Sequence, residues 1–150
     1  MKKILALMVV FILGITTLMG CSGGYTRDTS SGSIVEERLD TIIEMAENKE
    51  DFVVIFTQIT CKDCIIAESI MTPYLENHSV EIKDVVLDHE GTTDEEIQAN
   101  RKKINSVFPN FNATPSMYYV KDGKVVDEII EFSEEAELEE WVVKNQLDKK

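Results

Sequence analysis

Basic residues are scarce in this chain. Its 150 residues include 15 Lys and Arg against 28 Asp and Glu, which gives a formal net charge of −13. A protein that binds nucleic acid through phosphate contacts needs a basic surface, so no nucleic-acid partner is predicted. High acidity of this kind more often keeps a protein soluble than marks a binding site. The length allows one domain and a targeting segment.

Cysteines are also few. The chain has three, and two of them lie together in the stretch Cys61-Lys62-Asp63-Cys64. A scaffold held by several disulfides would distribute its cysteines along the chain, so that class of protein is not indicated. No glycine-rich phosphate loop and no internal repeat is visible in the sequence.

A long hydrophobic run occurs only near the N-terminus. Residues 4–18 are apolar and follow two lysines; the run is short for a membrane span of about twenty residues and suits a signal peptide. The stretch Leu18-Met19-Gly20-Cys21 resembles the lipobox of bacterial lipoproteins, in which the chain is cut before the cysteine and its thiol receives a diacylglyceryl group. An ordinary secretory signal with a chance cysteine is the alternative.

The resemblance to lipoproteins implies three segments. Residues 1–20 would be a signal peptide, and Cys21 would carry the lipid that holds the protein on the extracytoplasmic face of the cell membrane. Residues 21–32 are small and polar, which predicts a flexible tether. Residues 33–150 would form the folded domain.

The hydrophobic pattern of the domain predicts an α/β fold. Runs typical of buried or half-buried strands occur at 52–57, 80–87, 116–120 and 124–130. Helices are predicted to begin near Ser33, Cys61, Thr93 and Ser133. Ser33 with Glu36, and Thr93 with Glu96, have the spacing of a capping box. Asp122-Gly123 predicts a tight hairpin turn between the last two strands.

The cysteine pair directly follows the first predicted strand. We expect Cys61 at the N-terminus of a helix, where partial positive charge and unpaired N–H groups stabilise a thiolate. The thiolate is the nucleophilic form of cysteine. Cys64 lies one helical turn further on and can close a disulfide with Cys61. This spacing favours reversible dithiol–disulfide chemistry with no cofactor other than the redox-active pair.

The order of elements resembles the thioredoxin-like family of thiol–disulfide oxidoreductases. The resemblance covers residues 33–147 and includes the cysteine motif after a hydrophobic strand and Thr114-Pro115 before a hairpin. It implies a central mixed sheet of about four strands flanked by helices, with Cys61 attacking and Cys64 resolving. It also implies a cis peptide bond before Pro115, and substrate contacts from Thr114 and from Thr60, Lys62 and Asp63.

The sequence departs from thioredoxin itself at several positions. Thr60 replaces the tryptophan before the first cysteine, and Lys62-Asp63 replaces Gly-Pro between the cysteines. Ile55 replaces a buried aspartate that transfers protons to the second cysteine, so the proton must go to water or to another group. About ten extra residues fall in the acidic stretch 88–103. Among small relatives, the chain resembles the thioredoxin-like accessory proteins of Gram-positive bacteria, including those that oxidise exported bacteriocins.

These resemblances together imply a membrane-anchored oxidoreductase. Its partners would be the thiols and disulfides of exported proteins and a membrane redox protein that recycles the cysteine pair. Lys62 favours a Cys61 thiolate and Asp63 disfavours it, so the sequence does not assign reduction or oxidation.

Other interpretations remain open at this point. The pair could belong to a metal-binding module with His78 or His89, although a structural zinc site needs four ligands and no second cysteine pair exists. The domain could also be a non-catalytic lipoprotein that keeps the fold for binding. The acids of the 88–103 stretch do not have the spacing of a calcium loop, and this stretch could recognise a partner.

Overall fold

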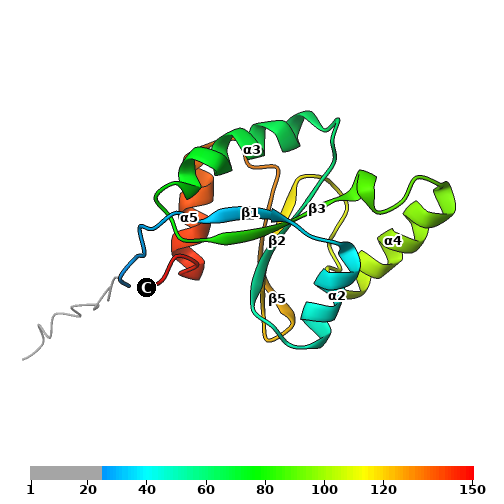
Figure 1. Ribbon diagram of the computed structural model, residues 1–150, viewed down its shortest axis with the longest axis horizontal. Coiled ribbons are helices and arrows are strands. Elements are labelled where there is room, and N and C mark those ends of the chain that lie inside the picture. Colours follow the sequence, from blue (N-terminus) through cyan, green and yellow to red (C-terminus); the bar gives the residue numbers. More distant parts are fainter. Residues whose placement is uncertain (1–24) are drawn as a thin grey trace, which may run out of the picture.

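The computed structural model describes residues 25–150, which form a sheet with helices on both faces (Figure 1). The strands are β1 (Ser33–Glu36), β2 (Phe52–Thr57), β3 (Glu81–Val86), β4 (Ser116–Lys121) and β5 (Lys124–Ile130). The helices are α2 (Leu39–Glu47), α3 (Lys62–Leu75), α4 (Asp94–Val107) and α5 (Glu135–Asn145), with a 3-10 turn η1 (Leu87–His89). The predicted signal peptide and Cys21 lie outside the described residues.

The strand order in the sheet is β1-β3-β2-β4-β5. The first three of these strands run parallel, and β4 and β5 are antiparallel to their neighbours. A parallel pair needs a crossover, which α3 supplies between β2 and β3. The mixed sheet and the flanking helices confirm the predicted fold class, with five strands in place of about four.

The fifth strand corrects one prediction. Ser33 and Glu36 do not begin a helix: residues 33–36 form β1, and Ser33 is in register with Glu81 of β3. Ile34 and Val35 are β-branched and fit a pleated strand, and the exposed edge of β3 offers them backbone partners. The first helix begins only at Leu39, with Arg38 as its N-cap residue.

Each face of the sheet has its own hydrophobic core. On one face, α3 and α5 pack through Ala67, Met71 and Leu138, all nearly inaccessible to solvent. On the other face, α2 and α4 cover an aromatic group made by Phe56, Phe108, Phe111 and Tyr118. Burial of one such side chain contributes about 1.5–3 kcal/mol. The two cores pack against the two faces of β2, and the cysteine motif follows directly after β2.

The predicted local signals have mixed outcomes. Thr93 and Glu96 form the expected capping box of α4. The hairpin turn is also confirmed: Asp122 and Gly123 both have positive φ, and a Cβ on Gly123 would meet the Ala46 carbonyl oxygen at 2.1 Å. The N-cap of α5 is Glu134, one residue after the predicted Ser133.

Residues 25–32 are not a flexible tether, which corrects part of the predicted segment 21–32. Arg27 pairs with Glu139 and, at 2.7 Å, with the fully buried carboxylate of Asp148. The hydroxyl of Tyr25 donates to the same carboxylate at 2.6 Å. We call this group, together with Tyr74, the Arg27 clamp. It binds the start of the described chain to its C-terminal residues.

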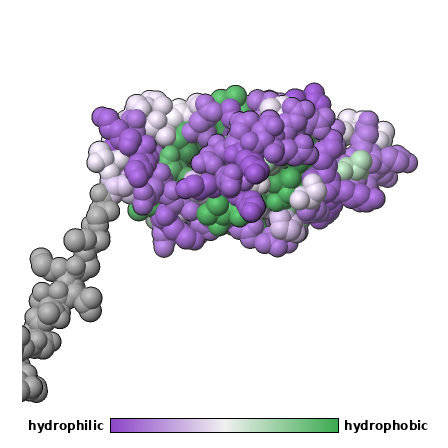
Figure 2. All heavy atoms as spheres, turned by 90° about the horizontal axis from the view of Figure 1, so that it is seen from below, coloured by the Kyte–Doolittle hydropathy of each residue, from purple (hydrophilic) through white to green (hydrophobic). Residues whose placement is uncertain are grey.

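The outer surface carries the acidic character of the sequence. Figure 2 shows a face covered mainly by hydrophilic residues, with small apolar patches between them. Within residues 25–150, no helix has the length and apolar content that a membrane crossing requires.

Candidate functional site

The two cysteines meet where β2 ends and α3 begins. Cys61 is the N-cap residue of α3, and its Sγ accepts a hydrogen bond from the backbone N–H of Cys64 at 3.1 Å. The two residues form a disulfide with their Cα atoms 5.2 Å apart. Cys61 is half-buried and Cys64 is only 5% exposed. A reagent from solution therefore reaches the sulfur of Cys61 first.

The residue before Pro115 contacts Cys61. The peptide bond between Thr114 and Pro115 is cis, as expected. Sγ of Cys61 lies 3.4 Å from the Thr114 carbonyl oxygen. The Thr114 hydroxyl donates to the side-chain carbonyl of Gln58 at 3.1 Å, which connects this loop to the end of β2. The structure thus brings together the two segments that the sequence singled out.

The other predicted contact residues surround Cys61. Thr60, Lys62 and Asp63 are all exposed, so the two charges inside the motif are solvated. The sequence analysis did not single out three exposed isoleucines, Ile59, Ile65 and Ile66. Their side chains are 59%, 56% and 42% exposed and flank the motif along the chain. Exposed apolar groups beside a reactive sulfur offer a docking surface for another polypeptide.

Asp84 is a further residue that the sequence analysis missed. It lies on β3 in register with Ile55 of β2, so the two side chains point to the same face of the sheet. Ile55 packs in the core beneath α3, which places Asp84 under α3 as well. Asp84, Cys64 and Glu68 line a common cavity of about 520 Å³. Asp84 differs from the other polar residues of β3 because it lies opposite Ile55. The sequence alone does not show this strand register.

The environment of Asp84 favours its protonated form. Burial is the main reason that the pKa of its carboxyl group is raised, and the nearby Glu36 and Glu68 carboxylates act in the same direction. The Thr57 hydroxyl, which donates to Asp84 at 2.7 Å, and His89 both oppose this rise in pKa. Asp84 can therefore exchange a proton at a higher pH than an exposed aspartate.

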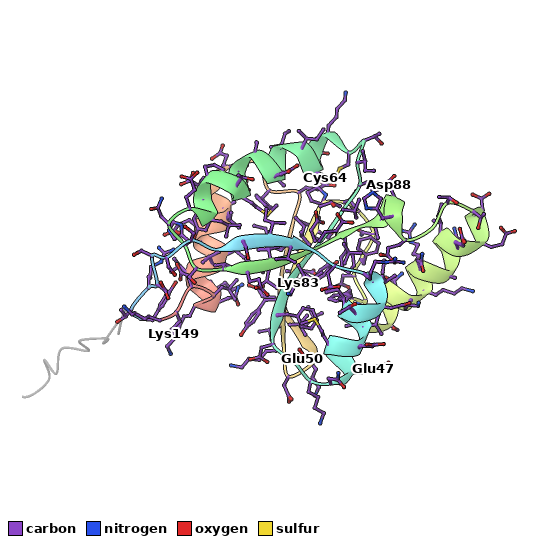
Figure 3. All side chains as sticks on the ribbon, viewed as in Figure 1. Glu47, Glu50, Cys64, Lys83, Asp88 and Lys149 are labelled. Carbon is purple, nitrogen blue, oxygen red and sulfur yellow. A yellow bond between two sulfur atoms is a disulfide. The ribbon has the colours of Figure 1, made fainter. Side chains whose placement is uncertain are left out.

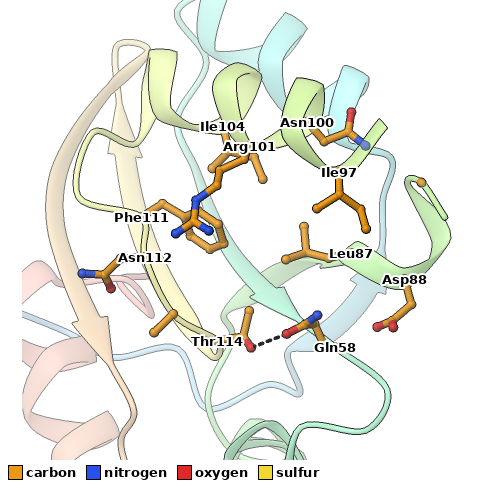
Figure 4. Close-up of a pocket in the computed structure, with 12 residues that line it drawn as sticks. Gln58, Leu87, Asp88, Ile97, Asn100, Arg101, Ile104, Phe111, Asn112 and Thr114 are labelled. Atoms are coloured by element: carbon orange, nitrogen blue, oxygen red, sulfur yellow. Dashed lines mark hydrogen bonds between the residues drawn. The ribbon is translucent and has the colours of Figure 1, made fainter. Parts of the chain in front are cut away.

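A second cavity is lined in part by Thr114. It measures about 220 Å³ and is enclosed by α4, the η1 turn and residues 111–114 (Figure 4). Thr114 and Gln58 line it and also contact the disulfide region. The acidic stretch 88–103 therefore forms one wall of a cavity beside the cysteine pair.

Neither histidine lies at the cysteines in the described structure. Nδ1 of His78 is 2.7 Å from the Tyr74 carbonyl oxygen, and its ring stacks on the Tyr74 ring. Nδ1 of His89 is 2.7 Å from a Glu36 carboxylate oxygen. Residues 25–150 bring together no group of three His, Cys, Asp or Glu side chains that could hold a metal ion.

The backbone of this chain is similar to those of several thioredoxins. Neither a protein-family model nor a curated protein sequence matches the chain. A thioredoxin of Malassezia sympodialis (Mala s 13) is similar with a TM-score of 0.57 and 15% identity, over 79% of this chain and 94% of that one. Thioredoxin f from spinach chloroplast (short form) gives 0.56 and 15%, over 77% and 96%. Thioredoxin f2 of Chlamydomonas reinhardtii gives 0.54 and 16%, over 78% and 100%.

Proposed function

We propose that this chain, which has the thioredoxin-like α/β fold, is a thiol–disulfide oxidoreductase that acts through Cys61 and Cys64. The observation that carries the proposal is the position of the two sulfurs. One is accessible and lies at a helix N-terminus, and its partner is buried one turn further on. This arrangement separates an attacking sulfur from a resolving sulfur.

The exchange proceeds in two displacement steps. In the reduced protein, the Cys61 thiolate attacks one sulfur of a substrate disulfide, and the other substrate sulfur leaves as a thiolate. Cys64 then attacks the Cys61 sulfur, which closes the Cys61–Cys64 disulfide and releases the second substrate thiolate. Two electrons pass to the substrate, and the reverse sequence oxidises a substrate dithiol. The helix N-terminus and the Cys64 N–H stabilise the Cys61 thiolate in both directions.

Asp84 is the group that takes the proton of Cys64. The buried Cys64 thiol must lose its proton before it attacks, and Ile55 offers no acceptor. The Asp84 carboxylate lines the same cavity and has a raised pKa, so it can accept this proton and return it in the reverse reaction. Glu68 lies one helical turn from Cys64 on α3 and raises the affinity of Asp84 for the proton.

The substrate is an exported polypeptide rather than a small thiol. Ile59, Ile65 and Ile66 are the apolar rim around Cys61, and Thr114 presents backbone groups beside the sulfur. A small disulfide would need no such rim. The resemblance to accessory proteins that oxidise bacteriocins supports the same class of substrate, and a membrane redox protein would recycle the cysteine pair.

The protein acts outside the cytoplasm, held by a lipid on Cys21. The support for this location is the sequence of residues 1–21, which lies outside the described residues. Expression in a bacterial host, with mass spectrometry of the mature N-terminus, tests it: Cys21 should be the first residue and carry acyl chains. The Cys21→Ala variant should lose the lipid, and an unmodified Cys21 would refute the anchor.

The activity is tested by equilibrating the cysteine pair with reduced and oxidised glutathione. A potential near that of thioredoxin, about −270 mV, indicates a reductant, and a far more positive value indicates an oxidant or isomerase. Cys61→Ser should abolish exchange, whereas Cys64→Ser should trap a mixed disulfide on Cys61 that gel electrophoresis detects without reductant. Wild-type protein that shows no exchange would refute the enzyme and leave a non-catalytic binding module.

A further inference from the structure

The cavity beside Thr114 lies where a bound substrate chain must pass. Thr114 lines this cavity, and its carbonyl oxygen is 3.4 Å from Sγ of Cys61. A polypeptide with its cysteine at Cys61 therefore has residues next to that cysteine within reach of the cavity. The volume of about 220 Å³ is below the roughly 300–1,000 Å³ of sites for drug-sized ligands. The cavity thus fits one side chain.

The lining of the cavity combines apolar walls with one cation. Ile97, Ile104 and Phe111 supply apolar surface, and the Arg101 side chain extends from α4 into the lining of the same cavity (Figure 4). Arg101 is exposed and makes no ion pair with any residue of the described part of the chain. A guanidinium group with free donors pairs readily with a carboxylate, often through two hydrogen bonds.

Asp88, the other charged residue of the lining, makes no ion pair with Arg101. Asp88 accepts a hydrogen bond from the backbone N–H of Ile59 at 2.9 Å, so its carboxylate is engaged at the loop that leads to Cys61. The overall charge of −13 is spread over the molecule and is screened beyond about 8 Å at physiological salt. Within the lining, Arg101 is therefore the charged group whose donors can pair with a bound side chain.

We propose that this cavity binds an acidic side chain next to the reactive cysteine of the substrate, with Arg101 holding the carboxylate. The aliphatic part of a glutamate would pack on the Ile97 and Phe111 walls, and its carboxylate would reach the guanidinium group. A lysine at the same place would meet a like charge. This inference rests on the proposed function and names the substrate class of that site.

The test uses peptides that carry one mixed disulfide and differ at one position. In separate series, Glu, Gln or Lys is placed at each of the two positions before the cysteine and at each of the two positions after it. With the wild-type protein, kcat/KM should decrease from Glu to Gln to Lys in at least one series, by about fivefold to tenfold in total, as expected for an ion pair in a partly enclosed site. Hydroxyethyl disulfide, which is neutral, serves as the reference substrate for every variant.

Two variants identify the residue responsible. Arg101→Glu should invert the order of Glu and Lys peptides once each rate is divided by the hydroxyethyl disulfide rate. Lys102→Glu is the matched control, because it makes the same reversal of charge at the neighbouring position of α4 without touching the cavity lining. It should keep the wild-type order.

Several outcomes would overturn the inference. Equal rates for Glu, Gln and Lys peptides at all four positions would refute an acidic subsite. Equal effects of Arg101→Glu and Lys102→Glu would assign the preference to overall charge. Both results require that the wild-type protein turns over hydroxyethyl disulfide. If that reaction is itself absent, the proposed function fails first.

Discussion

The carboxyl group of Asp84 destabilises the folded chain at neutral pH while it serves the proposed exchange. Burial raises its folded-state pKa above the ordinary value of 3.8. The folded chain therefore holds this proton more tightly than the unfolded chain. The free energy of unfolding falls as the pH rises from the ordinary pKa of 3.8 to the raised pKa of the folded chain. The ionised group is thus present at neutral pH at the expense of stability, a balance that is common at functional sites.

Asp84→Asn should make the protein more stable and less active. At pH 7 we expect the melting temperature to rise by about 2–4 °C, which corresponds to about 1 kcal/mol in a chain of this size. The rate of mixed-disulfide resolution should fall by about 10²-fold, because the proton acceptor of Cys64 is lost. Thermal unfolding followed by circular dichroism and stopped-flow turnover as a function of pH measure both effects.

Asp127→Asn is the matched control. Asp127 is also a partly buried strand aspartate, but its pKa is lowered: burial alone would raise it, and the contacts from Asn145 and Lys144 outweigh that effect. Its charge therefore stabilises the fold at neutral pH. The control should lower the melting temperature and leave the resolution rate unchanged. A fall in melting temperature for both variants would contradict the account of Asp84.

The site residues differ in how far the sequence reveals them. Cys61, Cys64 and Pro115 occur in local motifs, so their neighbours along the chain were sufficient to find them. The proposed role of Asp84 depends on strand register, and that of Arg101 depends on the packing of α4 near Gln58, which is distant in the sequence. Such contacts are set by tertiary packing, which periodicity alone does not specify.

Among the secondary-structure elements, two similar sequence signals led to different structures. Ser33-Ile34-Val35-Glu36 and the stretch 93–96 both match the pattern of a capping box, but only the second begins a helix. The β-branched residues after Ser33 favour a strand, and acids follow Thr93 in the first turn of α4, where the helix dipole favours them. Residues 33–36 form a strand because they pair with the edge of β3, and this partner is not apparent from the sequence.

Thr93→Ala and Ser33→Ala should therefore have unequal effects. The Thr93 hydroxyl accepts a hydrogen bond from the Glu96 N–H at 3.2 Å, and its loss should decrease the free energy of unfolding by about 1 kcal/mol. Ser33 is exposed and caps no helix, so its replacement should change stability by less than about 0.5 kcal/mol. Urea denaturation of both variants compares them directly, and equal losses would contradict the assigned helix boundaries.

At the level of the whole molecule, the Arg27 clamp joins the two ends of the described chain. The Arg27 guanidinium group is the main reason that the pKa of Glu139 is lowered to about 2; the Tyr74 hydroxyl and His78 lower it further, while burial opposes them. A lowered carboxyl pKa stabilises the fold above the ordinary value of 4.5, and this stabilisation is lost as the pH falls toward 2. Asp148 adds a buried carboxylate on the same guanidinium.

Arg27→Ala should destabilise the protein strongly at pH 7, by about 3 kcal/mol, because it leaves the buried Asp148 carboxylate without its cation. The difference from wild type should shrink as the pH falls from about 5 to 2, since the wild-type protein loses over this range the stabilisation that the lowered pKa of Glu139 provides. Urea midpoints at a series of pH values measure this. Lys103→Ala, which removes an exposed pair with Asp40, is the control and should have a small effect at every pH. A constant difference for Arg27→Ala would refute the linkage.

The start of the folded domain could not be predicted from the sequence. Small polar residues predicted a flexible segment up to residue 32, yet Arg27 finds its partners more than a hundred residues away. Local composition cannot show such partners. The fold class was nevertheless predictable, because the order of strands and helices and the two cysteine positions are local properties.

The clamp also determines how far the reactive sulfur would stand from a membrane. Arg27 contacts Tyr74 near the C-terminal end of α3, and Cys61 caps the other end of this 14-residue helix, about 21 Å away. Figure 3 shows Cys64 near this N-terminal end of α3. With a lipid on Cys21, four peptide steps, or at most about 14 Å of chain, separate the anchor from Tyr25. The domain would then lie close to the bilayer, with its dithiol about one length of α3 from the Arg27 clamp. A membrane protein that recycles the dithiol would need to reach a sulfur at that distance from the clamp.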